Sequence, residues 1–164
     1  LGAGQIGRHV GTTLRALGCH VDLVTSTLPH TDRDAAMRAA DYLVSVLPST
    51  PATRAFLTRE RLASLKDGVV WLNLGRGDIL ASEEALTSTL APHGPLRAAV
   101  LDVFPVEPLP TTSPLWANER VVISPHVAAI SMANDIAIVT RRHWEAYAAG
   151  NVQNLPIVSV DKQY

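Results

Sequence analysis

The chain has 164 residues, of which 47% are hydrophobic and 18% charged, and its formal net charge is −1. This size and composition allow a globular domain with a core and argue against disorder. The sequence has no basic tract, no signal peptide and no apolar run of the roughly 20 residues needed to span a bilayer. We therefore expect neither a nucleic-acid nor a membrane partner. A single cysteine, Cys19, cannot form an internal disulfide, which favours a reducing, cytoplasmic compartment.

Short apolar runs alternate with segments of helical character along the chain. The apolar runs predict strands at residues 21–24, 42–47, 69–74, 97–101 and 121–124. Helices are predicted at residues 6–17, 32–40, 58–65 and 82–90, with a final helix over about 131–149 that Gly150 and Asn151 end. Four prolines exclude a regular helix from residues 104–114. The alternation predicts an α/β fold with a doubly wound parallel sheet of the Rossmann type.

A glycine-rich turn opens the chain, where Gly2, Gly4 and Gly7 match the pattern G-x-G-x-x-G. The first glycine allows a tight turn, the second lets the backbone approach a pyrophosphate, and the third lets helix and strand pack closely. N–H groups at the helix start, around Gln5 and Ile6, would then meet the phosphate charge. An ordinary structural turn is the alternative, but the helix and strand that follow favour nucleotide binding.

The end of the predicted second strand bears on which nicotinamide cofactor is preferred. A carboxylate at this point accepts a hydrogen bond from the ribose of NAD, but Asp22 lies inside the predicted strand. Three hydroxyl residues follow the strand: Thr25, Ser26 and Thr27. Hydroxyl groups do not repel a 2′-phosphate, and Arg33 or His30 could reach one. We predict NADP in preference to NAD; the alternative is that residues 25–27 form only a polar turn.

Three later motifs are more specific than the glycines. They are Asn73-Leu74-Gly75-Arg76-Gly77, then Asp102-Val103-Phe104 followed by Glu107-Pro108, then Pro125-His126. In this order, behind a glycine-rich turn, they resemble the motifs of D-2-hydroxyacid dehydrogenases, and the resemblance covers essentially the whole chain. Independently of it, Arg76, Asp102 and His126 each follow a predicted strand. The carboxyl edge of a parallel sheet is where such sheets bind ligands, so the three side chains can converge.

The resemblance implies a catalytic set of Arg76, Glu107 and His126. Reduction of a keto acid needs a proton donor that titrates near neutrality, so His126 is the expected general acid. Glu107 would orient the ring and favour its charged form. Arg76 would bind the substrate carboxylate through its planar fork. Asp102 resembles the family residue near the nicotinamide ring. We expect no metal.

Further cofactor contacts are also implied by the resemblance. They are expected at Leu47, Pro48, Thr53, Leu74, Gly75, Arg76, Asp102, His126 and Ala128. For the loop that carries Leu47, Pro48 and Thr53, a turn bounded by proline is an almost equally good interpretation. We expect residues 1–150 to form the nicotinamide dinucleotide-binding domain and residues 151–164 to be a tail that returns to an N-terminal substrate domain absent from this fragment.

Departures from the general pattern narrow the expected reaction. Ala128 and Ala129 stand where many members have glycines, and together with residues 113–116 they are most similar to the bacterial glyoxylate/hydroxypyruvate reductase A group. The implied activity is reduction of glyoxylate or hydroxypyruvate to the D-2-hydroxy acid with NAD(P)H, by a homodimer. Alternatives are another family member, such as a phosphoglycerate or formate dehydrogenase, and a non-catalytic nucleotide-sensing module. The fragment alone is expected to be inactive.

Overall fold

The computed structural model describes residues 1–157 and residue 160. The chain divides into two compact units, Leu1–His126 and Val127–Tyr164, each described by itself below. A domain boundary at residue 150, as expected from the sequence, stays a prediction. Residues 158–159 and 161–164 of the expected tail lie outside the described residues.

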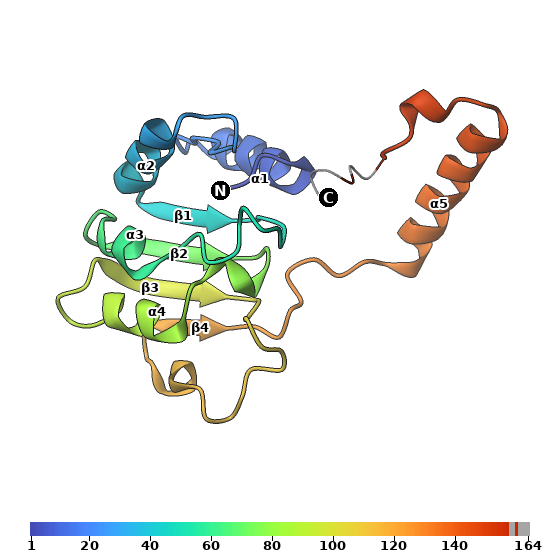
Figure 1. Cartoon of the computed structure of the whole chain (residues 1–164). Coiled ribbons are helices and arrows are strands. Elements are labelled where there is room, and N and C mark those ends of the chain that lie inside the picture. Colours follow the sequence, from blue (N-terminus) through green and yellow to red (C-terminus); the bar gives the residue numbers. More distant parts are fainter. Residues whose placement is uncertain (158–159, 161–164) are drawn as a thin grey trace. The chain divides into compact units, whose positions relative to one another are not determined.

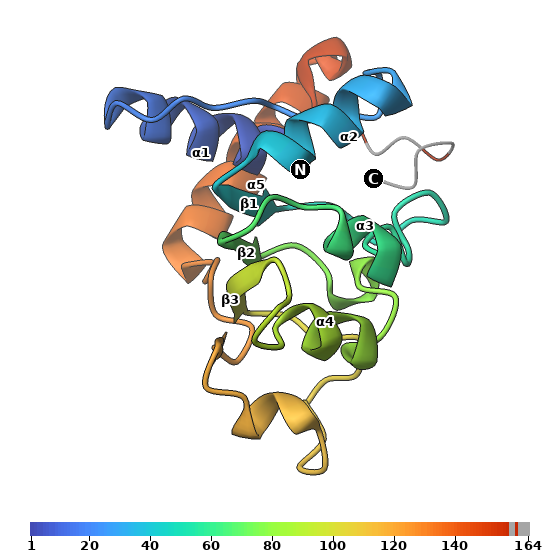
Figure 2. The same ribbon diagram turned by 90° about the vertical axis from the view of Figure 1, so that its left-hand side faces the viewer.

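The first unit is built on a parallel sheet. Within the described residues its strands are β1 (Tyr42–Ser45), β2 (Val69–Asn73), β3 (Leu96–Leu101) and β4 (Val121–Ile123), which lie side by side in chain order (Figure 1). The helices are α1 (Gln5–Ala16), α2 (His30–Ala39), α3 (Arg59–Ala63) and α4 (Glu83–Thr89), with short 3₁₀ helices η1 (Gly77–Ile79) and η2 (Pro114–Ala117). With the strands seen nearly end-on, α3 and α4 lie on one side of the sheet and α1 on the other (Figure 2). The predicted α/β fold of the Rossmann type is confirmed.

The core lies between one face of the sheet and the helices that cover it. The strand register places Leu43 beside Trp71, and both side chains are buried. Met37 of α2, Leu62 of α3 and Leu86 of α4 belong to the same apolar cluster. The indole N–H of Trp71 donates to Ser45 Oγ at 2.9 Å, so this polar group is satisfied inside the core. The packed core gives the carboxyl edge of the sheet a rigid support.

The strand predicted at residues 21–24 is not formed, and this prediction was wrong. The segment has no regular secondary structure and no ladder of strand hydrogen bonds. Gly2 N–H donates to the carbonyl of Val24 at 3.0 Å, and Leu1 in turn accepts from Val46 N–H at 3.0 Å beside β1. Because only Leu1 and Gly2 lie between this segment and β1, the neighbouring backbone is too short to pair with a full strand. The apolar pattern predicted a strand but did not show how little neighbouring backbone it has to pair with.

The remaining elements agree with the predictions to within a few residues. α4 begins directly after Ser82, as expected, because the Ser82 hydroxyl accepts from Ala85 N–H at 3.0 Å and caps the helix. β1 ends at Ser45 rather than at residue 47, since Val46 pairs with Leu1 instead of with β2. Proline does exclude a regular helix from most of residues 104–114, and η2 starts only at Pro114.

The second unit contains α5 (Ala133–Ala148) and the short 3₁₀ helix η3 (Val152–Asn154). Gly150 ends α5 as predicted: its φ of 76° suits a residue without a side chain, and its N–H donates to Tyr147 at 3.0 Å. No residue of α5 is buried. Among the described residues, none of the helices is both long enough and apolar enough to cross a membrane.

Candidate active site

Three of the predicted site residues follow neighbouring strands of the sheet. Asp102 comes directly after β3, while Arg76 and His126 follow the last residues of β2 and β4 within one short turn. The carboxyl ends of these parallel strands lie at the same edge. A hollow of about 380 Å³ opens at this edge, and its lining residues are Ser49, Arg76, Gly77, Asp78, Phe104, Pro105, Glu107 and His126. The structure therefore brings the predicted catalytic set of Arg76, Glu107 and His126 around one space.

The turn that carries Arg76 is braced by the buried side chain of Asn73. Its amide nitrogen donates to the Arg76 carbonyl at 3.0 Å, and its oxygen accepts from Gly75 N–H at 3.3 Å. A Cβ on Gly75 would lie 2.6 Å from the carbonyl oxygen of Leu47, and a Cβ on Gly77 would lie 1.9 Å from the backbone of Phe104. Only glycine fits at either position, so Arg76 is held between two loops.

His126 owes its position to Asp102. The N–H of the buried Asp102 donates to the Asn73 carbonyl at 3.1 Å, and the Asp102 carbonyl accepts from His126 N–H at 2.9 Å. The Asp102 carboxylate accepts from Ser124 Oγ at 2.5 Å. His126 has a φ of 56°, a left-handed conformation that is uncommon outside glycine and marks functional sites. That Asp102 also contacts the cofactor stays a prediction.

Glu107 and His126 form a hydrogen-bonded pair at the edge of the hollow. Glu107 Oε2 lies 2.8 Å from His126 Nδ1, and Oε1 accepts from Phe104 N–H at 2.8 Å. Burial alone would raise the pKa of the Glu107 carboxyl. The hydrogen bonds from His126 and Phe104, together with the charges of His126 and Arg76, outweigh burial and lower this pKa below its ordinary value. Glu107 therefore stays ionised beside the imidazole.

The glycine turn fits a dinucleotide phosphate. Gly2 has a φ of 93°, and a Cβ on Gly7 would lie 1.9 Å from the carbonyl oxygen of Gly2, so helix and turn approach closely only because both are glycines. A Cβ on Gly4 would meet nothing within 4 Å, and no side chain caps the start of α1. The first N–H groups of this helix, around Gln5 and Ile6, thus face open space, as a phosphate site requires.

Polar groups suited to a 2′-phosphate follow this turn along the chain. The hydroxyls of Thr25 and Thr27 are 2.6 Å apart and flank Ser26. Arg33, in the first turns of α2, has a buried Nε without a hydrogen-bond partner among the described residues. Asp22 pairs instead with His20, at 3.3 Å. A buried guanidinium nitrogen without a hydrogen-bond partner lowers the stability of the fold, which is consistent with a side chain that binds an anion.

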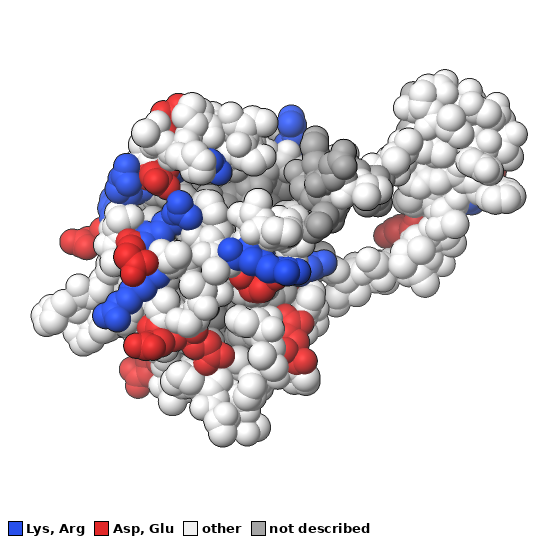
Figure 3. Space-filling view, in the orientation of Figure 1, with Lys and Arg blue, Asp and Glu red and all other residues white. Residues whose placement is uncertain are grey.

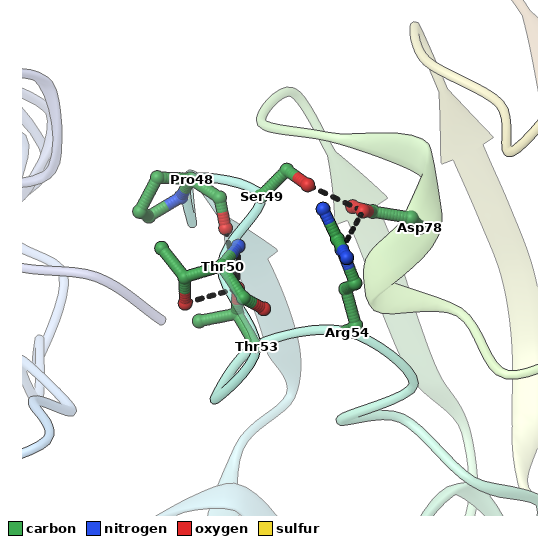
Figure 4. Close-up of polar contacts among 6 residues, drawn as sticks. All are labelled: Pro48, Ser49, Thr50, Thr53, Arg54 and Asp78. Carbon is green, nitrogen blue, oxygen red and sulfur yellow. Dashed lines mark hydrogen bonds and ion pairs between the residues drawn. The ribbon is translucent and has the colours of Figure 1, made fainter. Parts of the chain in front are cut away.

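The loop that carries Leu47, Pro48 and Thr53 is folded by its own hydroxyls (Figure 4). Thr53 Oγ1 donates to the Pro48 carbonyl at 2.6 Å and lies 3.0 Å from the Thr50 hydroxyl. The backbone of Leu47 faces Gly75, so two of the predicted cofactor positions lie together, and Leu74 N–H donates to the Ser45 carbonyl at 2.9 Å. Ala128 lies in the second unit.

Several residues that line or support the hollow were not among the predicted site residues. Gly77 lines it, and Asn73 braces the turn beside it. Both could have been found, because they belong to the N-x-x-R-G motif whose geometry they maintain. Ser49 and Asp78 carry no motif signal, yet they lie on the wall of the same hollow. They meet only because the loop after β1 folds against η1.

Comparison with known proteins defines the class of this chain. The family described as D-isomer specific 2-hydroxyacid dehydrogenase, NAD binding domain, matches residues 1–128. The chain belongs to this family, as its motifs predicted. It is 37% identical over 142 residues to glyoxylate/hydroxypyruvate reductase A of Serratia proteamaculans, covering 80% of this chain and 45% of that protein. The Escherichia fergusonii protein of the same name is 33% identical, covering 86% and 48%. The chain thus spans about half the length of these curated relatives.

Solved structures with similar folds carry the same family names. An NADPH-dependent glyoxylate/hydroxypyruvate reductase from Sinorhizobium meliloti, in complex with NADP and sulfate, is 29% identical with a TM-score of 0.83, covering 99% of this chain and 55% of that one. A probable 2-hydroxyacid dehydrogenase from Rhizobium etli, in complex with NADP, is 31% identical with a TM-score of 0.78, covering 91% and 51%. The family and these neighbours support a nicotinamide dinucleotide as cofactor.

Proposed function

We propose that this chain is the nucleotide-binding and catalytic half of an NAD(P)-dependent reductase that converts glyoxylate or hydroxypyruvate to the D-2-hydroxy acid. The observation that carries the proposal is the convergence of Arg76, Glu107 and His126 on one hollow at the carboxyl edge of the sheet. The similarity to two proteins named glyoxylate/hydroxypyruvate reductase A supports the choice of substrate.

Arg76 binds the carboxylate of the keto acid in this proposal. Its guanidinium lies on the wall of the hollow, and its planar fork matches a carboxylate with two parallel hydrogen bonds. The same positive charge polarises the adjacent carbonyl group, where negative charge develops during reduction. Asn73, Gly75 and Gly77 fix the backbone of Arg76, so little reorganisation is needed when substrate binds.

His126 delivers the proton to the carbonyl oxygen. Glu107 holds Nδ1 at 2.8 Å, so Nε2 is the ring atom that carries the proton to the substrate. The negative charge of Glu107 favours the imidazolium form that a proton donor requires. When bound, the nicotinamide cofactor supplies the hydride for the carbonyl carbon. After reduction, the neutral imidazole stays hydrogen-bonded to Glu107 and can take up a new proton.

NADPH is the preferred cofactor in this proposal. The hydroxyl cluster at residues 25–27 and the unpaired Nε of Arg33 support a site for the 2′-phosphate. Solved neighbours whose names specify NADPH dependence or a bound NADP also support it. We further propose that the full-length protein is a cytoplasmic homodimer, and that the substrate pocket is completed by a domain beyond this chain. The retained Arg76, Glu107 and His126 argue against a purely nucleotide-sensing role.

The function is tested on the full-length protein with glyoxylate, hydroxypyruvate, pyruvate and phosphohydroxypyruvate, each with NADPH and with NADH. We expect fastest turnover with the first two acids and NADPH. His126→Asn should lower kcat by about 10³-fold, because a positioned proton donor contributes about 10²–10⁴-fold. Cofactor binding, followed by fluorescence titration, should be retained. His93→Asn, an exposed histidine distant from the motifs, is the matched control.

Two results would overturn this proposal. Absence of keto acid reduction by the full-length protein with either cofactor would exclude the function. Wild-type rates in His126→Asn would exclude the mechanism but not the function. The 164-residue chain alone is expected to bind the cofactor with little turnover, and robust reduction by this chain would show that no further domain is needed.

A further inference from the structure

A second carboxylate lies on the wall of the hollow. Asp78 is the middle residue of η1, two positions after Arg76, and its side chain is 34% exposed. It lines the same space as Arg76, Glu107 and His126. Nothing in the proposed proton transfer or carboxylate binding uses it, so its effect on a bound substrate has to be considered separately.

Asp78 is held by two donors from the loop after β1 (Figure 4). Ser49 Oγ donates to Oδ2 at 2.5 Å, and Arg54 Nε lies 3.3 Å from the same oxygen. The Arg54 side chain is 63% exposed and meets Asp78 through a single nitrogen. Water and salt screen such an exposed guanidinium strongly, so it only partly offsets the field of Asp78 inside the hollow.

The charges around the hollow have distinct partners. Glu107 is paired with His126, whereas Arg76 is the arginine that faces the space and is assigned to the substrate carboxylate. Acidic and basic side chains are interspersed on the face drawn in Figure 3, and the chain is nearly neutral overall. With both signs of charge on this face, the charges nearest the hollow have the largest influence on which ions enter it. A second anionic group on a substrate would meet the carboxylate of Asp78.

We propose that Asp78 determines substrate specificity by restricting this site to 2-keto acids whose remaining substituent is uncharged. The inference rests on the proposed keto acid reduction. A hydrogen atom, a methyl group or a hydroxymethyl group can lie beside Asp78, and a hydroxyl can donate to it. A phosphate or a second carboxylate cannot donate when ionised and is repelled. Discrimination by like charge is a common way to reject a competing ligand.

A purely structural role for Asp78 makes a different prediction. If the carboxylate only ties the loop after β1 to η1, then removal of Arg54 should have the same kind of effect as removal of the Asp78 charge. If Asp78 acts on the substrate by its charge, the two substitutions should have different effects on substrate preference. Loss of the acid then favours anionic substrates, whereas loss of its counter-charge does not.

The test compares kcat/KM for phosphohydroxypyruvate with kcat/KM for hydroxypyruvate in the full-length protein. Asp78→Asn keeps the shape and removes the charge, and it should raise this ratio about tenfold, corresponding to about 1.4 kcal/mol. Arg54→Gln should not raise it. Asp67→Asn, an exposed carboxylate beside the opposite end of β2, is the matched control and should leave the ratio at the wild-type value.

A salt series on the unaltered protein gives a second readout. The wild-type ratio should rise with ionic strength as the repulsion is screened, and the Asp78→Asn ratio should rise less. The inference is overturned if the wild type reduces phosphohydroxypyruvate as efficiently as hydroxypyruvate, if Asp78→Asn leaves the ratio unchanged, or if Asp78→Asn and Arg54→Gln raise it alike. These results differ from failure of the proposed function, in which none of the acids would be reduced.

Discussion

Glu107 and Asp78 are two carboxylates on one hollow, and they differ in what holds them. Each accepts from two donors, but the partners of Glu107 are a backbone N–H and a histidine, whereas those of Asp78 are a hydroxyl and an arginine. Histidine gains and loses a proton near neutrality, and arginine does not. One wall of the hollow can therefore take part in proton transfer, while the other carries a fixed charge.

This difference follows from the loops that supply the two acids. Glu107 lies in the proline-rich segment after β3, and its contact with Phe104 N–H folds that segment back toward β4. Asp78 lies in η1, next to the turn that fixes Arg76. The two loops meet where Gly77 touches the backbone of Phe104. A change at this contact should therefore affect both Glu107 and Asp78. A change within one of the two loops should affect only the acid that this loop carries.

Gly77→Ala should have the largest effect, because it breaks the contact on which both acids depend. The new Cβ would lie 1.9 Å from the Phe104 backbone, so one of the loops must move. Overpacking of this kind costs about 1–3 kcal/mol of unfolding free energy. Displacement of the site by about 1 Å can lower kcat/KM by about 10²-fold. Thermal unfolding and steady-state kinetics of the full-length variant measure both quantities.

Gly68→Ala is the control for this prediction. It places a Cβ at a glycine with a φ of 86°, where nothing lies within 4 Å, so it lowers stability through backbone strain and not through a collision. A loss of stability in both variants but a loss of activity only in Gly77→Ala is expected. Wild-type kcat/KM in Gly77→Ala would show that the contact between the two loops does not position the site.

Glu107→Gln should affect proton transfer through His126 and leave the Asp78 side of the hollow unchanged. Without the negative charge, the imidazolium form of His126 is less favoured, so kcat should fall about 10–100-fold and the alkaline limb of the pH profile for reduction should move to lower pH. His126→Asn, by contrast, should remove this limb. Equal pH profiles in Glu107→Gln and wild type would exclude an electrostatic role for Glu107.

Acid stability offers a second view of the same variant. The folded-state pKa of Glu107 is lowered from its ordinary value of 4.5. A carboxyl whose pKa is depressed by folding stabilises the protein above its unfolded pKa, and that contribution is lost as the pH falls through the folded value. The difference in unfolding free energy between wild type and Glu107→Gln should thus be present at neutral pH and shrink below about pH 4.5. A difference that grows on acidification would contradict this sign.

The sequence predicted the sheet well wherever a strand has neighbouring backbone to pair with. The runs at β2 and β3 are nearly continuous and apolar, and both strands lie where they were expected. The segment 21–24 has a similar apolar character but forms no strand, since Leu1 and Gly2 offer it only the hydrogen bond from Gly2 N–H to the Val24 carbonyl among the described contacts. An apolar pattern indicates that a segment favours a strand conformation. Whether the strand forms also depends on a neighbouring strand that can pair with it, which the pattern does not reveal.

The site was predictable to a similar degree and for a similar reason. Arg76, Glu107 and His126 could be named because their motifs are local and because parallel strands bring their ends to one edge. Asp78 and Ser49 are separated by 29 positions, and their contact depends on how two loops fold against each other. The left-handed backbone of His126 likewise has no signature in the sequence. Contacts between loops were therefore the part that could not be foreseen.

Ser49→Ala should have the smallest effect, and it tests whether the hydrogen bond from Ser49 modulates the influence of the Asp78 charge on substrate choice. The change removes the hydroxyl that donates to Asp78 and leaves the pairing with Arg54. A single neutral hydrogen bond contributes about 0.5–1.5 kcal/mol, and part of it will be replaced by water in so open a place. Without this donor, the negative potential of the Asp78 carboxylate inside the hollow should be slightly stronger.

The ratio of kcat/KM for phosphohydroxypyruvate to that for hydroxypyruvate should consequently fall in Ser49→Ala, by at most about threefold. Ser64→Ala, which removes an exposed hydroxyl bonded to the Arg61 carbonyl at the end of α3, is the matched control. A rise in the ratio would mean that Ser49 orients Asp78 toward the substrate and that its loss turns the carboxylate away. The sign of this small change therefore distinguishes a hydroxyl that moderates the charge of Asp78 from one that aims it.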